Sequence, residues 1–143
     1  MFLGTHFPKL DAKGRLILPA RFRDDLAAGL VLTKGQERCL VVWPRAEFEV
    51  YSQRLRTNAQ ANAQVRAVTR VFFSSAFDES VDAQGRLTIP PVLRDYAGLE
   101  RELAVVGADT RIEIWSSRAW DAYLGQHEQA FAELDLEGGV ALP

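Results

Sequence analysis

The sequence predicts an α+β fold, rich in β-strands, in which two tandem copies of one small module share a barrel-like sheet flanked by helices. Three observations support this prediction. A nine-residue segment recurs with six identical residues, turn residues recur at matching places, and a chain of 143 residues leaves each copy too small to bury a core alone. The composition, 48% hydrophobic and 25% charged, is typical of a globular protein. We therefore expect the strands of the two copies to interlock.

The repeat is clearest at Asp11–Pro19 (DAKGRLILP), which recurs 71 positions later as Asp82–Pro90 (DAQGRLTIP). After a one-residue insertion the offset becomes 72, and the further matches are Gly35 with Gly107, Trp43 with Trp115, Phe48 with Trp120 and Tyr51 with Tyr123. Matches that keep their order over this length identify two copies of one module. We predict a first repeat at 1–57, a connecting helix at 58–75, a second repeat with a C-terminal helix at 76–135, and a tail at 136–143.

Each copy begins with a pattern typical of a β-hairpin. Residues 6–10 and 15–19 alternate between polar and apolar and favour strands. Between them, the tetrapeptide DAKG at 11–14 favours a type I turn with a glycine bulge, because aspartate can cap the turn and glycine accepts a positive φ. The tetrapeptide DAQG at 82–85 repeats this turn in the second copy.

The rest of each copy predicts further strands and helices. Pro19 and Pro90 end the second strand of each hairpin and can open a short helix. Apolar runs predict strands at 30–33, 40–43, 103–107 and 112–115. Aromatic and apolar residues at helical spacing predict helices after Trp43, at 61–74 and at 116–131.

Charge is unevenly distributed along the chain, although the net charge is only −2. Residues 1–23 contain five cations, Lys9, Lys13, Arg15, Arg21 and Arg23, and the single acid Asp11. After Arg118 the chain has no lysine or arginine, and its charged residues are all acids: Asp121, Glu128, Glu133, Asp135 and Glu137. The net charge argues weakly against a nucleic-acid-binding protein, whereas the basic first segment favours one.

The two arginines that follow the turns are the first candidates for a binding role. Arg15 and Arg86 each stand at the first strand position after a turn, and Lys9 and Lys13 are near Arg15 in the sequence. A two-stranded ribbon fits the major groove of DNA, where arginine can contact phosphate or guanine. The residues alone leave a second interpretation open, in which each arginine only pairs with the aspartate of its own turn.

The repeated spacing resembles a known DNA-binding motif. Asp-x-x-x-Arg followed by Leu-x-x-Pro, present in both copies, is similar to the SpoVT/AbrB swapped-hairpin motif. The tandem arrangement, the start Met1–Thr5 (MFLGT) and the segment Phe72–Ala76 (FFSSA) resemble the MraZ family across residues 1–135. This resemblance implies two AbrB-like repeats in a pseudo-symmetric shared barrel, homo-oligomeric rings, and double-stranded DNA as the partner.

For function, the resemblance implies a sequence-specific bacterial transcription factor, associated with the nucleoid. Such proteins bind short direct repeats upstream of the division and cell-wall gene cluster, including their own gene. Together with the basic side chains and the glycine of the first turn, the motif gives the expected DNA-binding residues: Lys9, Asp11, Lys13, Gly14, Arg15, Asp82 and Arg86. The second copy differs in charge, because Gln84 stands where the first has Lys13, and Asp78 and Glu79 flank its first strand. We therefore expect the first turn to make the stronger contact.

Other classes of function have less support. His6 and His127 stand outside any catalytic motif, and no Gly-rich phosphate loop or metal-ligand cluster occurs, so we expect no enzyme, cofactor or metal site. The alternative is an antitoxin-like protein-binding module, since antitoxins add a toxin-binding tail to a related hairpin dimer. Cys39, the only cysteine, lies in an apolar run and is expected in the core. Without a signal peptide or a membrane-length apolar stretch, we expect a cytoplasmic protein.

Overall fold

The structure, a computed structural model, describes residues 1–58 and 62–134. Its strands are β1 (Thr5–His6), β2 (Arg15–Ile17), β3 (Leu30–Lys34), β4 (Leu40–Pro44), β5 (Phe77–Glu79), β6 (Arg86–Thr88), β7 (Leu103–Ala108) and β8 (Arg111–Ser116). Its helices are α1 (Ala20–Arg23), α2 (Arg45–Asn58), α3 (Ala63–Ser74), α4 (Pro91–Ala97) and α5 (Ser117–Glu133). The helices predicted after the prolines and tryptophans are present. Positions 59–61 of the predicted connecting segment, position 135 of the predicted second repeat and the predicted tail at 136–143 lie outside the described residues.

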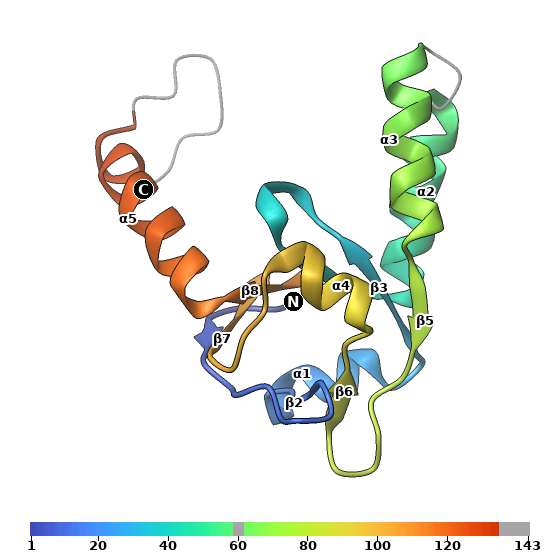
Figure 1. Cartoon of the computed structure of the whole chain (residues 1–143). Coiled ribbons are helices and arrows are strands. Elements are labelled where there is room, and N and C mark those ends of the chain that lie inside the picture. The colour runs from blue at the N-terminus through green and yellow to red at the C-terminus, as the bar shows by residue number, and fades with distance from the viewer. Residues whose placement is uncertain (59–61, 135–143) are drawn as a thin grey trace.

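The strands of the two repeats interlock (Figure 1). Six strands form one antiparallel sheet in the order β1-β7-β8-β4-β3-β5, and β2 pairs with β6 in a separate two-stranded ribbon. The pairs β1–β7, β3–β5, β4–β8 and β2–β6 each join a strand of the first repeat to a strand of the second. The prediction of an α+β fold with a shared β-rich sheet is therefore confirmed.

The predicted local hairpin between residues 6–10 and 15–19 is wrong. The turn at 11–14 forms, but the segments on either side of it separate and pair with the second repeat, β1 with β7 and β2 with β6. The physical reason lies in the core. Pairing β2 with β6 brings Leu16 and Leu87 together at 1% and 0% exposure, so that one core includes side chains from both repeats.

A pseudo-twofold axis relates the two repeats. Equivalent residues pair directly at two places, Leu16 with Leu87 in the ribbon and Val41 with Glu113 between β4 and β8. The buried core draws on both repeats and contains Phe2, Leu16, Leu18, Phe22, Leu26, Leu30, Leu32, Leu40, Val42, Leu87, Ile89, Leu93, Ala97, Leu103, Val105, Ile112 and Ile114. Because these side chains pack in one cluster, neither repeat has a complete core of its own.

Two helical arms project from the sheet on the side opposite the ribbon (Figure 1). One arm is the hairpin of α2 and α3, and the other is α5. Trp43 stacks on Tyr51 with ring centres 4.8 Å apart, and Trp115 lies 4.9 Å from Tyr123, so the two arms rest on equivalent aromatic contacts. Cys39 packs beneath these rings at 1% exposure, as predicted, and burial raises the pKa of its thiol to about 12. None of the described helices is long and apolar enough to cross a membrane.

Candidate nucleic-acid interface

The first turn is held by the carboxylate of Asp11. Its Oδ1 accepts hydrogen bonds from the backbone N–H groups of Lys13 and Arg15, both at 2.9 Å. Its Oδ2 accepts a hydrogen bond from Nε of the Arg15 side chain at 2.8 Å. These donors lower the pKa of Asp11, and the backbone N–H of Arg15 is the largest cause. Asp11 therefore stays ionised at neutral pH and orients the guanidinium of Arg15.

The second turn repeats this geometry with one difference. Asp82 accepts hydrogen bonds from the backbone N–H groups of Gln84 and Arg86 at 2.9 and 2.8 Å, and from Nε of Arg86 at 2.7 Å. These bonds, led by that of the Arg86 backbone, lower the pKa of Asp82. Gln84 also accepts a hydrogen bond from Nη2 of Arg86 at 3.3 Å, which Lys13 in the first turn cannot do. In residues 1–58 and 62–134, the Nη groups of Arg15 donate to no protein acceptor, whereas one of Arg86 is engaged.

The two arginines lie on one exposed face of the β2–β6 ribbon. The register sets Arg15 opposite Thr88 and Ile17 opposite Arg86, with the paired leucines between them. Because side chains alternate along a strand, the buried leucines point into the core and the other four residues point outward. The ribbon therefore presents one oriented arginine from each repeat on the same surface.

Each turn glycine is covered by an arginine of the other repeat. Gly14 has φ +76°, and a methyl group built there would lie 2.8 Å from Cζ of Arg94. Gly85 has φ +79°, and a methyl group built there would lie 2.5 Å from Nε of Arg23. Arg23 also donates to the carbonyl of Leu18 through Nε at 3.0 Å and Nη2 at 2.9 Å. Sequence reasoning left these two arginines out of the site, although their match at an offset of 71 was a signal of a shared role.

The other charged residues near the turns have different surroundings. Lys13 is exposed in the turn, whereas Lys9 is exposed before it and faces Glu102 across an isolated β-bridge. Asp78, which precedes the second turn, forms an ion pair with Arg45 of α2, and this hydrogen-bonded partner lowers the pKa of Asp78. Within the described part of the chain, no group of three His, Cys, Asp or Glu residues could hold a metal ion.

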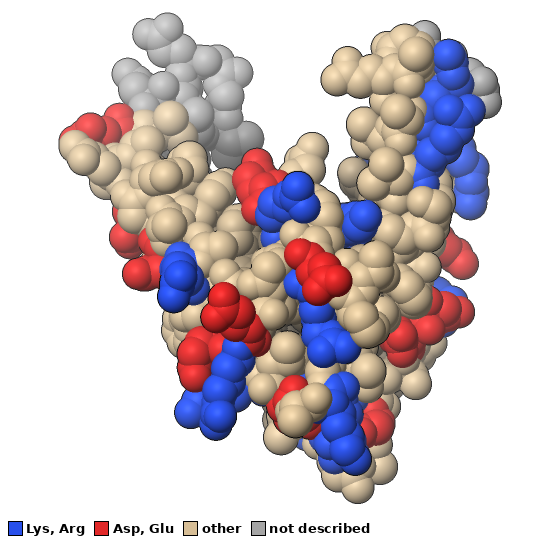
Figure 2. All heavy atoms as spheres, in the orientation of Figure 1, with Lys and Arg blue, Asp and Glu red and all other residues tan. Residues whose placement is uncertain are grey.

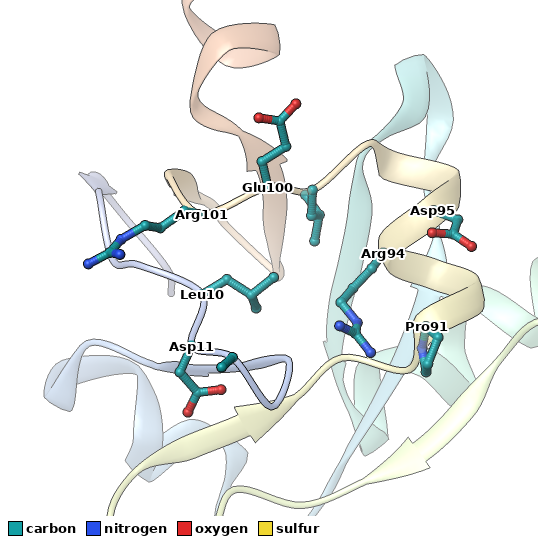
Figure 3. A pocket seen from close by; sticks show the side chains of 9 residues that line it. Leu10, Asp11, Pro91, Arg94, Asp95, Glu100 and Arg101 are labelled. Carbon is teal, nitrogen blue, oxygen red and sulfur yellow. The ribbon is translucent and has the colours of Figure 1, made fainter.

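A hollow of about 480 Å³ opens beside the first turn. The turn lines one side of it, and α4 with the segment that follows lines the other. Figure 3 shows the side chain of Arg94 pointing into the hollow, while the carboxylates of Asp95 and Glu100 point away from it. Arg94 therefore adds a positive charge next to the first turn, supplied by the second repeat.

Both halves of the chain match one known family. The family model described as "MraZ protein, putative antitoxin-like" matches residues 1–71 and again residues 72–137. A relative from Salinispora arenicola, named Transcriptional regulator MraZ, is 59% identical over 140 residues, which cover 98% of this chain and 97% of the relative. Relatives of the same name from Frankia alni and Paenarthrobacter aurescens are 58% identical over 137 and 135 residues, which cover 96% and 94% of both chains. With both repeats and nearly the whole length matched, this chain belongs to the MraZ family.

Proposed function

We propose that the protein is a transcriptional regulator that binds double-stranded DNA through the outer face of its β2–β6 ribbon. Membership of the family and the name of the relatives support the regulatory role. The observation that carries the proposal is the register, which sets Arg15 and Arg86 on one exposed face, each oriented by an aspartate. Guanidinium groups held in this way match phosphate oxygens and the major-groove edge of guanine.

The dimensions of the ribbon suit the major groove. A groove about 12 Å wide admits a two-stranded β-ribbon, and known ribbon proteins read DNA in this way. In this proposal the repeats predicted at 1–57 and 76–135 each supply one strand and one turn, and the segment 58–75 joins them. The proposed targets are short direct repeats upstream of the division and cell-wall gene cluster, including the protein's own gene. Binding there would associate the protein with the nucleoid.

Footprinting on the DNA upstream of the protein's own gene tests this proposal. We expect protected boxes that repeat in one direction, no protection of a scrambled duplex, and an affinity that falls as the salt concentration rises. A purified protein that binds neither duplex would contradict the proposal. Binding that requires a second protein would favour the alternative, an antitoxin-like protein-binding module.

We also propose that copies of the chain assemble through their helical arms. The arm of α2 and α3 carries Arg45, Arg54, Arg56, Arg66 and Arg70. Its only acids among the described residues are Glu47 and Glu49 at the start of α2, so the outer part of the arm is basic. Helix α5 carries Arg118 at its start and the three acids Asp121, Glu128 and Glu133 after it. Figure 2 shows this difference as basic side chains on one arm and acidic ones on the other. Opposite charges on two arms of one chain favour a head-to-tail contact between copies.

Exposed apolar side chains support the same contact. Val68 on α3 is 58% exposed, and Phe131 on α5 is 67% exposed. In the first arm α3, from the connecting segment, covers α2, and Phe72 stacks on Phe48 with ring centres 5.9 Å apart. In the described part of the chain no second helix covers α5 in this way, although Trp120 is the counterpart of Phe48 (Figure 1). A second copy can supply that cover, and a head-to-tail contact that closes on itself forms a ring.

Light scattering of the purified protein at two salt concentrations tests this assembly. We expect a homo-oligomer whose mass falls when salt screens the arms. Arg66→Glu together with Arg70→Glu should dissociate it, and adding Glu128→Lys and Glu133→Lys to the same chain should restore it. A strict monomer, or an oligomer whose mass is unchanged by both pairs of substitutions, would count against assembly through the arms.

A further inference from the structure

Ile17 is the one apolar residue among the four outward side chains of the β2–β6 ribbon. It is 55% exposed, lies opposite Arg86, and is two positions along β2 from Arg15. Its counterpart across the pseudo-twofold axis is Thr88, which is also exposed. Single exposed apolar residues are common on protein surfaces, so exposure alone would not suggest a role. Its place beside two oriented arginines does.

We propose that Ile17 is a specificity-determining residue that contacts the C5-methyl group of a thymine in the major groove. This inference rests on the DNA-binding function proposed above. Among the four bases, only thymine presents a methyl group on its major-groove edge. Isoleucine has no hydrogen-bond donor or acceptor in its side chain, so it can recognise a base only through an apolar contact. Thr88 has a hydroxyl group, which can bond to several bases.

The spacing of the ribbon residues fits this readout. Side chains two positions apart on a strand are about 6.8 Å apart, and two steps along one DNA strand cover about the same distance. Arg15 and Ile17 can therefore contact bases about two steps apart. Arg86 lies across the ribbon, with its Cβ about 5 Å from that of Ile17. Because Thr88 differs from Ile17, rotating the ribbon about its axis changes the contacts, which gives the bound protein one direction along the DNA.

Replacing single thymines by uracil in the footprinted duplex tests this role, because the change removes only the methyl group. We expect the parent protein to lose about three- to five-fold in affinity at one position of the box, as for one methyl group left unburied. Ile17→Ala should bind the thymine duplex more weakly and show no further loss when uracil occupies that position. Thr88→Ala, a matched control on the same face, should keep the parent's sensitivity to uracil.

Both substituted side chains are exposed, so the variants should keep the parent's melting temperature and oligomer mass. Ile17→Val, which keeps part of the apolar contact, should retain part of the uracil effect. A parent protein that is insensitive to uracil at every thymine would overturn the role of Ile17, and so would an Ile17→Ala protein that keeps the full sensitivity. Both results would leave DNA binding itself intact. A parent protein that binds no duplex would overturn both proposals.

Discussion

Removing the guanidinium of Arg15 should weaken DNA binding more than removing that of Arg86. The two side chains occupy equivalent places on the ribbon, and each donates a hydrogen bond from Nε to the aspartate of its turn. They differ at the terminal nitrogens. Gln84 accepts a hydrogen bond from Nη2 of Arg86 at 3.3 Å, whereas Lys13 adds a positive charge to the first turn. A difference in binding between Arg15→Ala and Arg86→Ala therefore reports the asymmetry of the two turns.

The size of the effect follows from these contacts. An arginine that reaches a base edge contributes about 1–3 kcal/mol, so Arg15→Ala should weaken binding roughly 5- to 150-fold. A DNA contact through Nη2 of Arg86 displaces its hydrogen bond to Gln84, and an intramolecular hydrogen bond has a net value of about 1 kcal/mol. Arg86→Ala should therefore cost roughly five-fold less than Arg15→Ala. Lys13→Ala should act more mildly and reduce the salt dependence by about one unit of slope, as expected for a phosphate contact.

Titrations on the footprinted duplex at two salt concentrations measure these differences. Gln84→Lys is the matched variant for a gain in affinity. It removes the acceptor that competes for Arg86 and adds a positive charge, so it should strengthen DNA binding. Melting temperature and oligomer mass serve as controls for folding and assembly. If Arg15→Ala binds like the parent while Arg86→Ala fails to bind, the first turn is not the principal contact and the reasoning is refuted.

The shared core and the turns should also respond to substitution in measurable ways. Gly107→Ala would place a methyl group 2.5 Å from the backbone N of Leu3 and should cost about 3 kcal/mol or more in denaturant unfolding, whereas Gly98→Ala, with φ +60° and open space, should cost about 1–2 kcal/mol. Equal costs would show that the N-terminal segment at Phe2 and Leu3 moves aside freely. Leu87→Ala should cost about 2–5 kcal/mol and still unfold in one transition, because both repeats share its core; two transitions would indicate independent repeats. Folding lowers the pKa of Asp11, so its stabilising effect is complete above about pH 4 and is lost as the pH falls through the lowered value. The melting temperature of Asp11→Asn should therefore be below that of the parent at neutral pH and converge with it in acid, and equal values at neutral pH would contradict this.

The amino-acid sequence by itself determined the turns, the order of the elements and the matching aromatic contacts at the base of the two arms. Asp11 and Gly14 specify their turn through local side-chain hydrogen bonds and a positive φ, which need no distant partner. The match of Trp43 with Trp115 predicted equivalent packing, because equivalent strands and helices bring the same side chains together. The basic character of the first turn was also visible, since charge can be counted without knowing any contact.

Only the tertiary structure decided which strands pair and which side chains share a surface. The alternating pattern at 15–19 suits a local hairpin and an exchanged ribbon equally well, because a period of two specifies a buried face but not a partner strand. Exchange prevails because it buries Leu16 against Leu87 in one core that neither short repeat can complete alone. The same pairing brings Arg15 and Arg86, which are 71 positions apart, onto one exposed face. No local pattern contains a contact at that separation, so this shared face is a property of the folded chain.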